Sequence, residues 1–285
     1  MVARWELSRR LATRRKELGI DVKSVTDALG FTRNYWSAVE NDRTLIAEDK
    51  LRLLFDLFDF SDQDQSELLT LREDSRKRGW WDEYPSLSDD HKRFYGMEAG
   101  AVRIRTYGGH LIPGVLQTSA YTRAVIATDP GLSPVDLDRF AELRRRRQQH
   151  LFESSRPHLT VMLSEAALHQ QVAGPEVQAE QLQSLCDRTE DDTSAVTVHL
   201  LSFRVNPGAI INSTTLSFVE YEGAHLPTTA WQEGVQLFGD LDADEDDEEF
   251  RRLEIAWDHA MGQSLDVDES VVAMRRVIEE LVRTG

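Results

Sequence analysis

The chain has a single cysteine, Cys186, among its 285 residues, so an internal disulfide is excluded. It also lacks any apolar run near the roughly 20 residues that cross a bilayer, and its N-terminus lacks the charged-then-apolar pattern of a signal peptide. We therefore expect a cytoplasmic protein without membrane contact. Cys186 fits a small core residue on the helix around 178–185 better than a redox sensor, because no second cysteine can resolve an oxidised thiol.

An excess of positive charge is also missing, since the formal net charge is −17 and 29% of the residues are charged. This excludes a general nucleic-acid coat, because phosphate contacts need local positive charge. The acidity is unevenly distributed. Residues 1–60 hold eleven Lys and Arg against ten Asp and Glu, a net of +1 that leaves −18 to the remainder. DNA binding by the first residues is therefore compatible with the composition.

Catalytic glycine motifs are absent too: the sequence contains no G-x-S-x-G, Walker or dinucleotide-binding pattern. Asp242, Asp244 and Asp246 imitate the start of a calcium loop, but position six is Asp247 instead of glycine. The sequence therefore predicts no metal and no cofactor.

A few ionisable residues flank predicted strands without the i, i+4 spacing of a zinc protease, namely His199, Glu220, Glu222 and His225. We expect a protein that is not an enzyme. Action on a small metabolite would be favoured only if Glu165, His199 and Glu220 lined one cavity.

Residues 21–41, DVKSVTDALGFTRNYWSAVEN, predict two short helices joined by a tight turn at Gly30, with Thr32 capping the second helix. Trp36 and Val39 face inward in this arrangement. The outer side then carries the side chains that can reach base edges, which are Arg33, Asn34, Tyr35, Ser37 and Ala38. An ordinary packed helical hairpin is the alternative interpretation of this segment alone.

The flanking sequence favours a compact helical domain. Leu7, Leu11 and Leu18 predict an amphipathic helix that ends at Gly19. Closing helices are predicted from a second apolar set, Leu51, Leu53, Leu54, Leu57 and Phe58.

About the first 70 residues resemble the Cro/CI-type (XRE) helix-turn-helix DNA-binding domain, whose motifs match residues 11–19, 25–30 and 39–43. Val22 replaces the glutamine that usually touches a phosphate in this family. Thr26 replaces a small alanine, and it fits if its hydroxyl bonds back to its own helix. The predicted base or groove contacts are Arg33, Asn34, Tyr35 and Ser37, and the predicted phosphate contacts are Asn41, Arg43, Arg14 and Arg15.

The composition changes abruptly at Gly79, where GWWDEYP follows a charged helix. We therefore predict a DNA-binding domain over residues 1–78 and a second domain over 79–285. Trp80, Trp81 and Tyr84 are either a hinge or, as we prefer, the first core residues of the second domain.

Short apolar or alternating stretches in the second domain predict strands within 158–165, 195–203 and 214–222. Helices are predicted over 166–172, 176–186, 248–260 and 268–282. The predicted fold is a mainly α helix-turn-helix domain followed by an α+β domain with a small mixed sheet.

The IPGVLQT segment sets a turn at Pro113-Gly114, and Thr118 is placed to cap a helix that begins near Ala120. Candidate residues for binding a ligand or partner are Gln117, Thr118, Tyr121, Arg144, Arg147 and Glu165. Arg144 and Arg147 share a helix face because they are three apart. A rigid turn with a capped helix explains the 117–121 residues equally well and is preferred, and the dipole of a following helix is reason enough for Glu165.

From residue 80 onward the chain resembles the large C-terminal domain, of unknown function, found in helix-turn-helix regulators of actinobacteria of the WhiJ type. The matching positions are Glu98, Ile112, Pro113, Gly114, Leu116, Gln117, Thr118, Tyr121, Arg144, Arg147 and Gln148. The resemblance implies a transcriptional regulator linked to development or specialised metabolism, some of whose relatives are encoded beside a small partner protein.

We expect a repressor that binds double-stranded DNA as a homodimer, because one small domain reads few base pairs and two half-sites multiply the information. Its C-terminal domain is expected to respond to a small partner protein or a small-molecule effector. The alternative is an antitoxin-like protein that mainly holds a partner and binds DNA only to regulate itself.

Overall fold

The computed structural model describes residues 1–284 except 86, 192, 224, 234–237 and 243–247. Its contacts divide into two compact units, Met1–Met97 with Gly223–Leu226, and Glu98–Glu222 with Pro227–Gly285. This division falls later in the chain than the boundary that the composition predicts after residue 78. The boundary at residue 78 stays a prediction.

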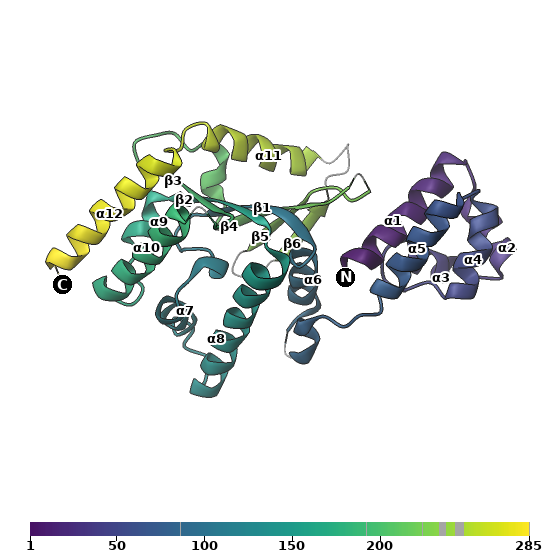
Figure 1. Cartoon of the computed structure of the whole chain (residues 1–285), viewed down its shortest axis with the longest axis horizontal. Helices are drawn as coiled ribbons and strands as arrows, with labels where there is room; N and C mark the ends of the chain where they lie inside the picture. Colours follow the sequence, from purple (N-terminus) through teal and green to yellow (C-terminus); the bar gives the residue numbers. More distant parts are fainter. Residues whose placement is uncertain (86, 192, 224, 234–237, 243–247, 285) are drawn as a thin grey trace. The chain divides into compact units, whose positions relative to one another are not determined.

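The first unit is built from helices (Figure 1). They are α1 (Val2–Glu17), α2 (Val22–Leu29), α3 (Arg33–Glu40), α4 (Glu48–Leu57), α5 (Asp62–Asp74), the short 3-10 helix η1 (Trp80–Glu83) and α6 (Asp89–Glu98). Helices α2 and α3 with the turn at Gly30 are the predicted helix-turn-helix, which is confirmed.

Local hydrogen bonds define this motif. Asp21 accepts the backbone N–H of Ser24 at 2.6 Å, a bond that lowers the pKa of the Asp21 carboxyl. Gly30 ends α2 in the left-handed conformation, with φ of 67°, and Thr32 then caps α3. The hydroxyl of Thr26 donates to the carbonyl of Lys23 at 2.9 Å, as predicted for a buried threonine in this position.

The core of the helical domain joins α1, α3 and α4 through Leu11, Trp36 and Leu54, all fully buried. Two apolar residues of the predicted helical segments are not part of it. Leu18 follows α1 and is 40% exposed, and Leu53 on α4 is 51% exposed. Both side chains fall outside the buried stripe of their helices.

Residues 80–97 group with the first unit. The ring of Trp80 stacks on that of Tyr95 in α6, with centroids 5.3 Å apart, and also meets the ring of Tyr84. The aromatic residues after Gly79 therefore pack around η1 and α6. This differs from our expectation that they begin the core of the second domain.

The second unit contains a mixed sheet with the strand order β3-β2-β1-β4-β5-β6 in the described residues. Its strands are β1 (Ala101–Gly108), β2 (His158–Ser164), β3 (Val196–Leu201), β4 (Thr215–Tyr221), β5 (Thr229–Glu233) and β6 (Phe238–Asp242). β1, β2 and β3 pair in parallel, and β4, β5 and β6 continue in antiparallel fashion. The predicted α+β class with a mixed sheet is confirmed, although sequence patterns found only β2, β3 and β4.

Helices surround this sheet. They are η2 (Gly114–Leu116), α7 (Ser119–Ile126), α8 (Pro134–Gln149), the π-helical turn η3 (His150–Ser155), α9 (Glu165–His169), α10 (Pro175–Glu190), η4 (Gly208–Asn212), α11 (Glu248–Met261) and α12 (Val267–Thr284). The four predicted helices are present, but the one expected over 166–172 ends at His169.

Both faces of the sheet are covered. One face is covered by α11 (Figure 1). Phe250 and Trp257 of this helix pack in a T-shaped arrangement against Phe218 of β4. On β2, the consecutive residues Val161 and Met162 are both fully buried although they point to opposite faces. The sequence of a strand that is buried on both faces is a continuous run of apolar residues. None of the described helices is both long and apolar enough to cross a bilayer.

Candidate nucleic-acid interface

Helix α3 separates its buried and exposed residues cleanly. Trp36 and Val39 are buried, whereas Arg33, Asn34 and Ser37 are exposed. The outward side of α3 therefore presents a guanidinium, an amide and a hydroxyl, all of which hydrogen-bond to base edges and phosphates.

Tyr35 is only half-buried, and its ring packs on that of Phe31 with centroids 4.4 Å apart. The contact fixes the ring at the start of α3. Its contact with a DNA groove stays a prediction.

The loop after α3 carries two more predicted contacts, Asn41 and Arg43. The side-chain amide of Asn41 donates to the carbonyl of Ser37 at 2.7 Å, which closes the end of the helix. Arg43 is exposed, and like Arg33 it makes no ion pair within the part of the chain that the structure describes. These two cations at opposite ends of α3 are available to phosphates.

Arg14 and Arg15 of α1 have intramolecular partners. Arg15 donates to the carboxylate of Glu40 at 2.6 Å and to the carbonyl of Ile20 at 2.8 Å. Arg14 donates to the carbonyls of Phe58 and Asp59 at 2.9 and 2.8 Å. Both arginines therefore brace the helical domain, and their contact with phosphates stays a prediction.

Most other cations around the motif are also paired with carboxylates. Arg10 is buried between Asp64 and Glu67, and its hydrogen bond lowers the pKa of Glu67. Lys23 donates to the carboxylate of Asp27, and this hydrogen bond raises the pKa of the Lys23 ammonium group. The small net charge of this region therefore conceals a local excess of unpaired positive charge at Arg33 and Arg43.

In the second unit, the structure brings four of the candidate residues together. They are Gln117, Thr118, Tyr121 and Arg144, which we call the Gln117 group. Gln117 is buried, donates to the carbonyl of Ile112 at 2.7 Å, and accepts from Arg144 at 2.8 Å. Thr118 caps α7 through the N–H of Tyr121, as predicted. Tyr121 is fully buried, and burial raises the pKa of its phenol.

Arg147 forms a separate, buried ion pair with Glu98. It holds both oxygens of Glu98 at 2.7 and 2.8 Å, with the two side chains 15% and 6% exposed. Its neighbour Gln148 donates to the carbonyls of Gly114 and Gln117. These bonds fix the IPGVLQT segment from the side of α8, so the preferred interpretation as a rigid turn agrees with the hydrogen-bond network.

Glu165 lies at the start of α9, where Ser164 is the cap. One of its carboxylate oxygens accepts from the hydroxyl of Ser202 and the N–H of Phe203 at 2.9 and 2.7 Å. It therefore ties the end of β2 to the end of β3, and it does not bond to the Gln117 group in the described residues.

The residues of the enzyme hypothesis have different partners. His199 on β3 contacts the carbonyl of Leu265, whereas Glu220 on β4 is 3.0 Å from Arg105. No group of three metal-binding side chains occurs among the described residues. Asp244 and Asp246 of the rejected calcium loop lie outside those residues.

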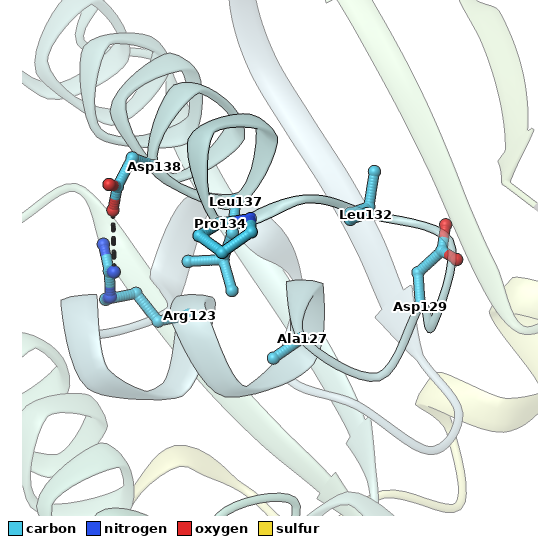
Figure 2. Close-up of a pocket in the computed structure, with 7 residues that line it drawn as sticks. All are labelled: Arg123, Ala127, Asp129, Leu132, Pro134, Leu137 and Asp138. Carbon is cyan, nitrogen blue, oxygen red and sulfur yellow. Dashed lines mark ion pairs between the residues drawn. The ribbon is translucent and has the colours of Figure 1, made fainter.

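A small pocket of about 220 Å³ lies between α7 and the start of α8. Figure 2 shows its apolar wall, formed by Ala127, Leu132, Pro134 and Leu137, with the ion pair of Arg123 and Asp138 at 2.7 Å on one side. Ligand pockets usually have volumes of about 300–1,000 Å³. Neither the Gln117 group nor Glu165, His199 and Glu220 line this pocket.

Sequence reasoning missed the roles of three residues that organise these sites. Gln181 of α10 accepts the N–H of Thr118 at 2.6 Å and donates to the carbonyl of Leu116, and Glu98 pairs with Arg147. No local pattern identifies partners 49 or 63 positions apart. Asp42, which is buried after α3, was missed as well, although a carboxylate in the VENDR segment that ends this helix could have signalled it.

Two family models match the chain. One, described as a helix-turn-helix domain, covers residues 6–69, and the other, described as a domain of unknown function (DUF5753), covers residues 91–276. Neither the comparison with curated proteins nor that with solved structures produced a match. The predicted combination of the two domains is confirmed.

Proposed function

The chain belongs to the family defined by the domain of unknown function DUF5753, and we propose that it is a sequence-specific transcriptional regulator that reads its site with α3. The helix-turn-helix domain at residues 6–69 indicates a DNA-binding regulator. The base-edge contacts are assigned to Arg33, Asn34, Tyr35 and Ser37. Arg43 and Asn41 contact phosphates, whereas Arg14 and Arg15 of α1 reach a phosphate only if they release their intramolecular partners.

The observation that carries this proposal is the contrast among the arginines of the helical domain. Arg10, Arg14 and Arg15 are held by carboxylates or carbonyls, whereas Arg33 and Arg43 are exposed without an ion pair in the described residues. Unpaired cations at both ends of an exposed polar helix face match the two needs of DNA recognition, which are phosphate positioning and base readout.

We propose a homodimer on a two-fold symmetric operator, because two copies of α3 on half-sites about one DNA turn apart, roughly 34–36 Å, give the specificity that one copy lacks. The resemblance to WhiJ-type regulators favours a repressor in development or specialised metabolism, acting in the cytoplasm. No enzymatic activity is part of the proposal.

The C-terminal domain is proposed to control DNA affinity through a partner. A small protein suits it better than a small molecule, because the Gln117 group is occupied by internal hydrogen bonds and the pocket at α7 is small. The acidity that lies outside residues 1–60 suits a partner with a basic surface. The second candidate function rests on the same acidity. In it, the protein mainly holds such a partner and binds DNA only to regulate its own gene.

The deciding experiment is to sequence genomic DNA fragments that co-purify with the full chain, with and without a co-expressed small protein from a neighbouring gene. Palindromic sites whose occupancy changes with the partner support a regulated transcription factor. Enrichment of only its own promoter supports the partner-holding function. No enriched site in either condition contradicts both DNA-binding functions.

A further inference from the structure

Asp42 lies two residues after α3 and is unusual for a carboxylate. Its side chain is only 3% exposed, and its backbone adopts the left-handed conformation with φ of 54°. Aspartate tolerates this conformation better than most residues with a Cβ. A buried carboxylate is costly unless it is paired, so its partners determine whether this backbone is held.

Two arginines from different helices approach Asp42. Arg4 of α1 donates to one carboxylate oxygen at 2.6 Å. Arg93 of α6 lies 3.6 Å from the other oxygen, which is buried and has no hydrogen-bond partner among the described residues. At this distance Arg93 makes no hydrogen bond, but its charge stabilises the second oxygen of Asp42. The N-terminal ammonium of Met1 also interacts electrostatically with Asp42.

The backbone around Asp42 is tied directly to the recognition helix. The N–H of Asp42 bonds to the carbonyl of Val39 at 3.2 Å, and the N–H of Arg43 bonds to that of Ala38 at 2.8 Å. A force on the Asp42 side chain is therefore transmitted to the end of α3 and to the base of the Arg43 side chain.

We propose that Arg93 of α6 is a positioning residue for DNA binding, an inference that rests on the proposed function. Arg93 holds Asp42, and Asp42 in turn holds the loop that presents Arg43 to a phosphate. Arg93 lies outside residues 6–69, which the helix-turn-helix model covers. In this proposal α6 therefore contributes to DNA binding, although it lies outside the helix-turn-helix domain.

The test is a double-mutant cycle in the full chain, measured as affinity for a DNA fragment that the wild type enriches. Arg93→Gln is expected to weaken binding about tenfold and to lower the slope of log affinity against log salt by about 1, as loss of one phosphate contact does. Arg93→Lys, which keeps the charge, is expected to lose no more than about threefold. In an Arg43→Gln background, Arg93→Gln is expected to add little further loss, because both changes remove the same contact.

Lys92→Gln is the matched control, since it removes one positive charge from the same helix at a residue without an ion pair in the described residues. Thermal unfolding of each variant checks the fold. If Arg93→Gln does not fold, the cycle is run with Arg93→Lys, for which a smaller loss that is again not additive with Arg43→Gln is expected.

Equal binding by the Arg93→Gln and Lys92→Gln variants, or additive losses in the cycle, overturns the inference. In that case wild-type binding to the fragment leaves the proposed function intact. A wild type that enriches no fragment is a separate result, because it contradicts the proposed function before any variant is compared.

Discussion

An arginine and an amide on α3 have the opposite role to an arginine and an amide in the C-terminal domain. In the helix-turn-helix domain, Arg33 and Asn34 are exposed on α3. In the C-terminal domain, Gln117 and Arg144 bond to each other in the turn before α7. Residue type alone therefore does not identify a binding site. An unsatisfied, exposed donor is available to a ligand, whereas a satisfied one stabilises the fold.

The largest expected effect tests whether the helical domain has its own core. Trp36→Ala removes a fully buried ring from α3 and is expected to cost about 3–5 kcal/mol of unfolding free energy. Hydrogen exchange measured by mass spectrometry should show lost protection over α1–α5 and unchanged protection over β1–β4. The control is Leu53→Ala, an exposed site on α4 that is expected to change stability by less than about 0.5 kcal/mol. Equal loss of protection in the sheet would contradict the separation of the two regions.

The corresponding change in the C-terminal domain is Arg147→Gln. It leaves the buried carboxylate of Glu98 without its bidentate partner, which is expected to cost about 3 kcal/mol. Denaturant unfolding measures the loss. Arg252→Gln is the control, because its pair with Glu248 is largely exposed and is expected to contribute less than about 1 kcal/mol. Similar small effects for both variants would show that the Glu98 pair does not stabilise this domain.

Replacement of the exposed donors on α3 sharpens the comparison from the side of function. The Arg33→Ala and Asn34→Ala pair is expected to cost about 2 kcal/mol of operator binding, or roughly thirtyfold, with an unchanged thermal midpoint. Binding is measured with operator and with unrelated competitor DNA. Arg52→Ala removes an exposed arginine of α4 and serves as the charge-matched control. Unchanged operator affinity in the double variant would disprove the assignment of α3 as the reading element.

The smallest expected effect concerns Cys186, which is fully buried in α10. Burial raises the pKa of its thiol from 9.0 to about 11, so the folded protein holds its proton where an unfolded chain would release it. This stabilisation is fully present below pH 9 and is lost as the pH rises through 11. We expect no alkylation of the native protein at pH 8, full alkylation in denaturant, and a shallower loss of stability above pH 9 in Cys186→Ala. Rapid native alkylation would contradict this burial.

Local chemistry made much of this fold predictable. The predicted caps at Thr32 and Thr118 depend on residues within three positions, and the structure contains both. β1 was missed because Arg103 and Arg105 interrupt its apolar pattern. Their charge is balanced by Glu220, which lies beside them only once β4 has paired with β1.

In the candidate sites, too, local features could be predicted from the sequence and contacts between distant residues could not. The sequence identified the exposed face of α3, because helical periodicity decides which residues of a short amphipathic helix point outward. It did not reveal that Arg15 holds Glu40, since that pair joins α1 to α3 across 25 positions. Periodicity predicts direction within one helix, but contacts between helices depend on packing.

The sequence by itself determined the helix-turn-helix, its caps, the α+β class of the second domain and its acidity, because each follows from neighbouring residues or from composition. Only the tertiary structure decided the order of the strands, the pairing of Glu98 with Arg147 and the capture of Asp42 by Arg4 and Arg93. These features join residues that are distant in the chain, and the free energy that selects each partner exists only when the folded chain buries the two groups together.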